Sequence, residues 1–242
     1  MYGYHNAPLK FEYNEFILSC TNLDGVFLYK RDNTNDNDNN DNIEKIIHKE
    51  DCNLLINPIE PVNLPKKITS LLLIEFTKSI FISPSSIKKI YLTFPIEIGV
   101  FISDNKDNYE VLDFFTLAKK KYSIYGTPSN GTICKYWSSD THLSIPETNP
   151  LYEGILELQI TNSTVRWMEV SKTVLNAYGM KLYYDSEIVS MKVNMKITGQ
   201  YMAETDFISQ PILENMTNST ELYNVGKVKF VNITKYIMEN GI

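Results

Sequence analysis

Two acidic residues stand in apolar surroundings in this chain and are its first candidates for catalysis. Glu97 lies in the segment FPIEIGV and Asp113 lies in VLDFF. Paired carboxylates can serve as general acid and base, so the pair could belong to a hydrolase or a carbohydrate-active enzyme. The alternative is structural: Glu97 pairs with a lysine on a neighbouring strand, and Asp113 fixes a turn. We prefer this second interpretation, because structural ion pairs perturb acids as active sites do.

A run of three lysines stands directly before a tyrosine-rich segment. Lys119–Lys121 are followed by Tyr122 and Tyr125. Cations beside aromatic rings could bind an anionic or sugar ligand. The plainer alternative is a solvated strand edge, where lysines discourage pairing with a second chain.

A cysteine and a histidine could form a nucleophile and its base. Cys134 stands in a strand-like apolar segment, and His142 lies in a polar linker. Reactive cysteines need an accessible, electropositive setting, so we interpret Cys134 as a buried structural thiol. The sequence contains no G-x-S-x-G, H-E-x-x-H, Walker or G-x-G-x-x-G motif. We therefore expect no metal and no cofactor.

Composition excludes some partners. The formal net charge is −6, and Arg31 and Arg166 are the only arginines. Phosphate recognition needs clustered cations, so we expect no nucleic-acid binding. The N-terminus lacks the basic and apolar regions of a signal peptide, and no apolar run is long enough for a membrane helix, which predicts a soluble cytoplasmic protein. The chain contains three cysteines, Cys20, Cys52 and Cys134, from which no disulfide framework can be deduced.

The polar tract from 31 to 42 contains no apolar residue that could be buried. We expect it to be a mobile loop. Its acidic residues alternate with asparagines, but the glycine and glutamate that a calcium loop of the EF-hand type requires are missing. Before it, the Asp24–Gly25 pair predicts the turn of a β-hairpin between strands at 9–20 and 26–30. After it, Asn42 could cap a short helix with Ile43, Ile46 and Ile47 on one face.

The stretch from Pro58 to Ile102 has the densest apolar content of the chain. Prolines 58, 61 and 65 predict an extended approach segment, because proline is excluded from the interior of central strands. Ile90, Leu92 and Phe94 alternate with polar neighbours, which predicts a strand. Pro95 then predicts a corner where the chain bends between sheets. Beyond it, Ile96, Ile98, Val100 and Ile102 share one face, so alternation places Glu97 on the other face, outside the core.

The second half of the chain shows further period-two patterns. Leu156, Leu158 and Ile160 alternate with polar residues, and so do Met191, Val193, Met195 and Ile197. Short helices are expected from Pro211 and at 235–239, with a last strand at 227–233. Five N-x-S/T sequons occur, at Asn130, Asn162, Asn215, Asn218 and Asn232, and chance explains them in a chain rich in asparagine and threonine.

Four segments together resemble an archaeal family of domains of unknown function. They are PIEPVNLPKKIT, FPIEIGV, DFFTLAKKKYSIYGTP and GTICKYW, and the resemblance covers nearly the whole chain. It implies an archaeal, methanogen-type source and brings no activity, cofactor or catalytic residue. It directs attention to the positions Glu97, Asp113, Tyr122, Tyr125, Gly126, Gly131, Cys134 and Trp137.

We expect a mainly β protein with a sandwich-like antiparallel architecture and few short helices. Two packed units are predicted, residues 1–145 and 146–242. The function we expect is that of a non-enzymatic binding or assembly module with a protein or small-molecule partner, and homo-oligomers are possible. The candidate ligand or interaction residues are Glu97, Asp113, Tyr122, Tyr125 and Trp137. The alternative is a hydrolase or carbohydrate-active enzyme that uses Glu97 and Asp113.

Overall fold

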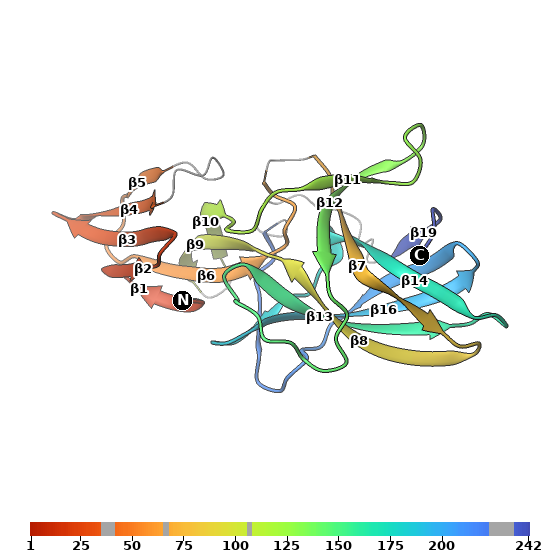
Figure 1. Ribbon diagram of the computed structural model, residues 1–242. Helices are drawn as coiled ribbons and strands as arrows, with labels where there is room; N and C mark the ends of the chain where they lie inside the picture. The colour runs from red at the N-terminus through yellow and green to blue at the C-terminus, as the bar shows by residue number, and fades with distance from the viewer. Residues whose placement is uncertain (35–41, 65–67, 106–107, 223–234) are drawn as a thin grey trace.

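The strands in the described part of the chain form four sheets that pair into two sandwiches (Figure 1). The computed structural model describes residues 1–34, 42–64, 68–105, 108–222 and 235–242. The first sandwich lies on the left of Figure 1 and contains the N-terminus, and the second lies on the right. The mainly β, largely antiparallel architecture confirms the predicted fold class.

The first sandwich consists of two four-stranded sheets, with the orders β1-β6-β9-β10 and β2-β3-β4-β5. Side chains from both sheets meet in one core, which includes Phe16 and Leu18 of β3 and Val100 of β9. The strands are β1 Gly3–Asn6, β2 Leu9–Glu12, β3 Phe16–Leu23, β4 Val26–Asn33, β5 Ile43–Ile47, β6 Asn53–Ile59, β9 Glu97–Asn105 and β10 Asn108–Phe115.

The second sandwich packs the sheet β11-β12-β7-β14 against a larger sheet in which β18, β15, β16, β13 and β8 follow one another. In the larger sheet β17 also pairs with β16 and with β19. Two strand pairs are parallel, β12 with β7 and β13 with β16. The strands are β7 Leu71–Ile82, β8 Ser86–Pro95, β11 Tyr122–Tyr125, β12 Thr132–Ser139, β13 Glu153–Asn162, β14 Met168–Asn176, β15 Tyr183–Tyr184, β16 Val189–Gly199, β17 Met202–Ile208, β18 Thr217–Asn218 and β19 Tyr236–Met238.

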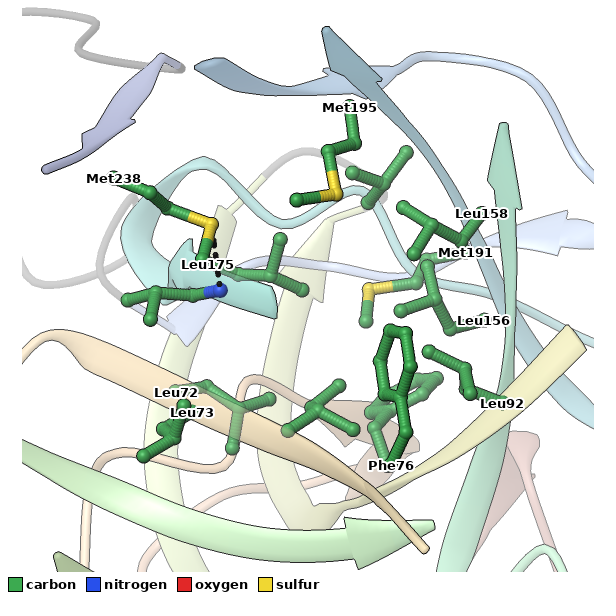
Figure 2. Close-up of a cluster of buried hydrophobic side chains, with 14 of the residues drawn as sticks. Leu72, Leu73, Phe76, Leu92, Leu156, Leu158, Leu175, Met191, Met195 and Met238 are labelled. Carbon is green, nitrogen blue, oxygen red and sulfur yellow. Dashed lines mark hydrogen bonds between the residues drawn. The ribbon is translucent and has the colours of Figure 1, made fainter. Parts of the chain in front are cut away.

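Period-two alternation of apolar residues builds the core of the second sandwich (Figure 2). Met191 and Met195 of β16 point into it, and so do Leu156 and Leu158 of β13. Methionine side chains are flexible and fill irregular space between branched residues. The sulfur of Met238, on β19 of the larger sheet, accepts a hydrogen bond at 3.5 Å from the amide of Val174 on β14 of the facing sheet.

The stretch from Pro58 to Ile102 carries the chain between the two sandwiches. β7 and β8 belong to the second sandwich, and β9 returns to the first. The corner predicted at Pro95 is confirmed, since β8 ends there and β9 begins at Glu97 in another sheet. Pro58, by contrast, lies inside β6 rather than in an approach segment. It fits because β1 pairs only as far as Ile56, so the missing amide of Pro58 interrupts no ladder on that side.

Each of the three predicted helical segments is wrong where the structure describes it. Residues 43–47 form strand β5, which pairs with β4, because three β-branched isoleucines suit a half-covered sheet as well as a helix face. Residues 210–221 form bends, turns and the short strand β18, and residues 236–238 form strand β19. Among the described residues, a 3₁₀ turn forms at Ala177–Gly179. The strand predicted at 227–233 lies outside the described residues.

The turn predicted at Asp24–Gly25 is confirmed, and the loop predicted from residue 31 begins too early. Asp24 and Gly25 both have positive φ, 47° and 91°, as a tight hairpin turn between β3 and β4 requires. β4 extends to Asn33, and its Arg31 is fully buried. Residues 35–41 lie outside the described residues.

Strand pairing crosses the point at which we predict two units to divide. β13 pairs with β8, and β14 pairs with β7, so strands from both sides of residues 145 and 146 share two sheets. The division into 1–145 and 146–242 stays a prediction. Within the part of the chain that the structure describes, no helix is long and apolar enough to cross a membrane.

Candidate functional site

Glu97 forms a buried ion pair between the two sandwiches. Its Oε1 lies 2.9 Å from Nζ of Lys135, and both side chains are at most 2% exposed. Glu97 begins β9 of the first sandwich, whereas Lys135 stands on β12 of the second. Alternation predicted Glu97 outside the core, and that prediction is wrong. Both faces of β9 are covered, one by the main core of its sandwich and the other by a small apolar cluster with Lys135 beside it.

Backbone groups complete the surroundings of the Glu97 carboxylate. The amides of Asn63 and Leu64 donate to its two oxygens at 3.1 and 3.3 Å. Burial raises the pKa of Glu97, while Lys135 and Asn63 act in the opposite direction. Tyr122 is brought close, since its hydroxyl donates to the Leu64 carbonyl at 3.1 Å. Burial, and then the charge of Glu97, raises the pKa of Tyr122.

Asp113 lies on the opposite face of the sheet from Glu97. It pairs across β10 and β9 with Val100, whose side chain fills the first core, and Val100 lies three positions after Glu97, so the two side chains point to opposite faces. Asp113 accepts hydrogen bonds from Arg31 Nε at 2.6 Å and from the Tyr29 hydroxyl at 2.9 Å. It stands at a bulge within β10, so the turn predicted for it is wrong. The two carboxylates therefore do not share a cleft, which the enzymatic alternative requires.

A cavity of about 380 Å³ lies beside β12, and Trp137 helps to line it. Its walls contain three aromatic side chains, Tyr136, Trp137 and Tyr152, together with Lys119 and Lys121. Among its described lining residues two are lysines and none is acidic. We call this space the lysine cavity.

Hydrogen bonds hold the aromatic walls of the lysine cavity in place. The indole nitrogen of Trp137 donates to Thr93 Oγ1 at 3.0 Å, and the Tyr136 hydroxyl donates to Glu75 at 2.6 Å. The hydroxyl of Tyr152 donates to Glu15, and burial followed by this bond raises the pKa of Tyr152 to about 12. All three rings thus present fixed apolar surfaces.

Tyr125 lines a second cavity of about 310 Å³, which shares Tyr136 with the lysine cavity. Its hydroxyl donates to the Gly241 carbonyl at 2.8 Å and accepts from the Asn240 amide at 3.1 Å. Tyr125 therefore anchors the C-terminal residues. Gly126, with φ at 111°, lets the next turn pass close to Asn240.

Comparison with known protein families identifies the family of this chain but assigns it no function. A family model described as a protein of unknown function (DUF432) matches residues 1–239. The chain belongs to the DUF432 family. No curated protein and no solved structure matches it.

The structure gives the predicted site residues of this DUF432 chain different settings. Glu97 and Tyr122 come together around Lys135, Trp137 lines the lysine cavity, and Asp113 and Tyr125 lie apart from both. In the lysine cavity the lysine run meets Trp137 and Tyr136 rather than Tyr122 and Tyr125. Cys134 is buried, and desolvation raises its pKa to about 11, which agrees with a structural thiol. Among the residues described, no three His, Cys, Asp or Glu side chains gather as a metal ion would need.

Sequence reasoning missed Glu60, a buried carboxyl of the DUF432 chain whose pKa is strongly raised. It is 3% exposed, and its Oε1 has no hydrogen-bond partner within the described residues. Burial, with smaller contributions from the charges of Glu97 and Glu221, raises the pKa of Glu60 to about 8. The segment IEPVNLP around it gave no signal, because its burial depends on strands distant in the sequence.

Glu60 is expected to make the protein less stable as pH rises. The unfolded chain loses this proton near the ordinary pKa of 4.5, whereas the folded chain holds it up to about pH 8. The destabilisation is therefore absent below pH 4.5 and grows as pH rises toward 8. From pH 5 to 7.5, the wild type should lose about 3 kcal/mol relative to Glu60→Gln.

Urea unfolding of both proteins across this pH range measures the effect. Glu147→Gln, at an exposed position, serves as the control. Parallel curves for the wild type and Glu60→Gln would show that Glu60 ionises normally.

Proposed function

We propose that this DUF432 protein is a non-enzymatic binding module that takes a small anionic sugar in the lysine cavity. The observation that carries the proposal is the composition of that cavity: three fixed aromatic walls, two lysines and no acidic side chain among its described lining residues. Aromatic faces pack against the apolar faces of sugar rings, and lysine ammonium groups attract carboxylate or phosphate. A volume of about 380 Å³ lies within the range of small-molecule sites.

The setting of the two lysines supports attraction of an anion. Both are exposed, so their ammonium groups can reach a ligand at the mouth of the cavity. The protein as a whole carries a net charge of −6, which repels anions. The local excess of positive charge at the lysine cavity would instead attract an anionic ligand to this one place. An archaeal, methanogen-type source and a cytoplasmic location belong to the same proposal, and the sequence resemblance supports the archaeal source.

Tryptophan fluorescence tests the proposal directly. Trp137 and Trp167 are the only tryptophans, and Trp167 is 65% exposed, so a Trp167→Phe background makes Trp137 the sole reporter. We expect glucuronate or glucose 6-phosphate to change the emission saturably, and neutral glucose to do so only weakly. Affinity should fall as ionic strength rises.

Removal of the two cavity lysines should weaken this binding. In Lys119→Ala/Lys121→Ala we expect a loss of affinity of about tenfold or more, because two charge-assisted contacts disappear. The matched control is Lys78→Ala/Lys88→Ala, which removes the same charge from exposed positions outside the cavity. Equal affinities in the two double variants, or no response to any anionic sugar, would contradict the proposal.

A further inference from the structure

Two of the three cysteines meet in the core of the first sandwich. Cys20 Sγ lies 3.9 Å from Cys52 Sγ, and the residues are 0% and 3% exposed. Cys20 stands on β3, in one sheet, and Cys52 directly precedes β6, in the facing sheet. Both thiols are free, and the sequence spacing gave no sign of their contact.

The geometry permits a bond between these two sulfurs. A disulfide has a sulfur–sulfur distance of about 2.05 Å, so each sulfur would have to move by only about 1 Å. Cys134 is no competitor, since it is buried in the core of the second sandwich. A bond would join the two sheets of the first sandwich and close a loop that contains β4 and β5.

The two sulfurs differ in a way that defines their roles. The contact with Cys20 and the nearby ammonium of Lys49 lower the pKa of Cys52, although burial opposes them. The contact with Cys52 and burial raise the pKa of Cys20. Cys52 also adjoins the exposed residues Glu50 and Asp51, whereas Cys20 is enclosed. Cys52 is thus the sulfur that an oxidant reaches first, and Cys20 is the sulfur that then attacks the oxidised Cys52 to form the disulfide.

We propose that Cys20 and Cys52 form an oxidation site at which hydrogen peroxide converts the thiol pair into a disulfide. The Cys52 thiolate attacks the peroxide oxygen, the O–O bond breaks, and a sulfenic acid and water form after proton transfer. The Cys20 sulfur then attacks the Cys52 sulfur, displaces the hydroxyl group and loses its proton, which yields a second water. Two thiols are oxidised by two electrons, and one peroxide is reduced to two waters. A dithiol reverses the change by exchange.

The bond is expected to stabilise the first sandwich. Closing a loop of this length restricts the unfolded chain, and for a protein of this size the melting temperature should rise by roughly 5–10 °C. The rise should disappear on treatment with dithiothreitol.

Thiol counting on the full chain tests the site without any variant. The reduced protein has three thiols in denaturant. After treatment of the native protein with hydrogen peroxide we expect one, with Cys20 and Cys52 in one disulfide-linked peptide pair by mass spectrometry. Three remaining thiols, a bridge to Cys134, or a bond between two chains would each overturn the proposal.

Three single variants check the assignment of the sulfurs. Cys134→Ala should keep the peroxide-dependent rise in melting temperature, and Cys52→Ala should lose it. In Cys20→Ala the Cys52 sulfenic acid has no resolving thiol, so a sulfenic-acid reagent such as dimedone should label Cys52. Labelling of Cys134 instead would assign the reactive sulfur to the wrong core and overturn the proposal.

Discussion

Replacing Lys135 by methionine is expected to lower the free energy of unfolding by about 3–5 kcal/mol at neutral pH. The change leaves the Glu97 carboxylate buried without a cation, at 0% exposure. Methionine fills a similar volume, so the loss reflects the missing charge rather than a cavity. Because Glu97 and Lys135 belong to different sandwiches, the loss also weakens the contact between them. Urea unfolding followed by circular dichroism measures it.

The pH dependence of this loss separates charge from packing. In Lys135→Met the pKa of Glu97 lies even further above its ordinary value, since burial raises it and Lys135 no longer opposes the shift. The resulting destabilisation is present above the unfolded pKa and is lost as pH falls toward it. The deficit should therefore shrink between pH 7 and pH 5, and Glu97→Gln/Lys135→Met should recover most of it.

An exposed ion pair provides the control for Lys135→Met. Lys10 and Glu12 form a salt bridge with side chains 59% and 62% exposed, so Lys10→Met should change stability by less than about 1 kcal/mol. A deficit in Lys135→Met that is no larger, or that does not vary with pH, would show that the buried pair does not hold the sandwiches together.

Local patterns predicted the strands, because side-chain alternation is a local property. Met191, Met195 and Ile197 are buried as their period-two spacing predicts, and Pro95 marks the corner between sheets. Where the local pattern of apolar residues fits a helix and a strand equally well, pairing with a strand distant in the sequence decides which of the two forms. Residues 43–47 fit a helix face and a strand equally well, and β4 supplied the hydrogen bonds that make them a strand.

The candidate site was harder to predict, since it depends on which strands face one another. The burial of Glu97 requires a second layer over β9, and its partner Lys135 lies 38 positions away. No local pattern could pair them, although the expectation that Glu97 meets a lysine was correct in kind. Cys20 and Cys52 come together for the same reason, across two sheets. Trp137 was found through the family resemblance, whereas Tyr152 and Glu60 gave no signal.

Loss of Arg31 is the second substitution with a large expected effect. Arg31 is 2% exposed, and its guanidinium donates to both oxygens of Asp113 and to Asn33 Oδ1. It also lies over the ring of Phe115, 4.7 Å from the centroid. Arg31→Met removes the partner of a buried carboxylate and should cost about 3–5 kcal/mol of unfolding free energy.

The two arginines of the chain offer a matched comparison. Arg166 is exposed, so Arg166→Met should cost less than about 1 kcal/mol in the same urea titration. Arg31→Lys retains the charge but loses the planar fork and the stacking on Phe115, so it should recover only part of the loss. Asp113→Asn/Arg31→Met, with no buried charge left, should be more stable than Arg31→Met alone. If Arg31→Met and Arg166→Met cost the same, the Arg31–Asp113 pair contributes nothing to the first sandwich beyond filling space.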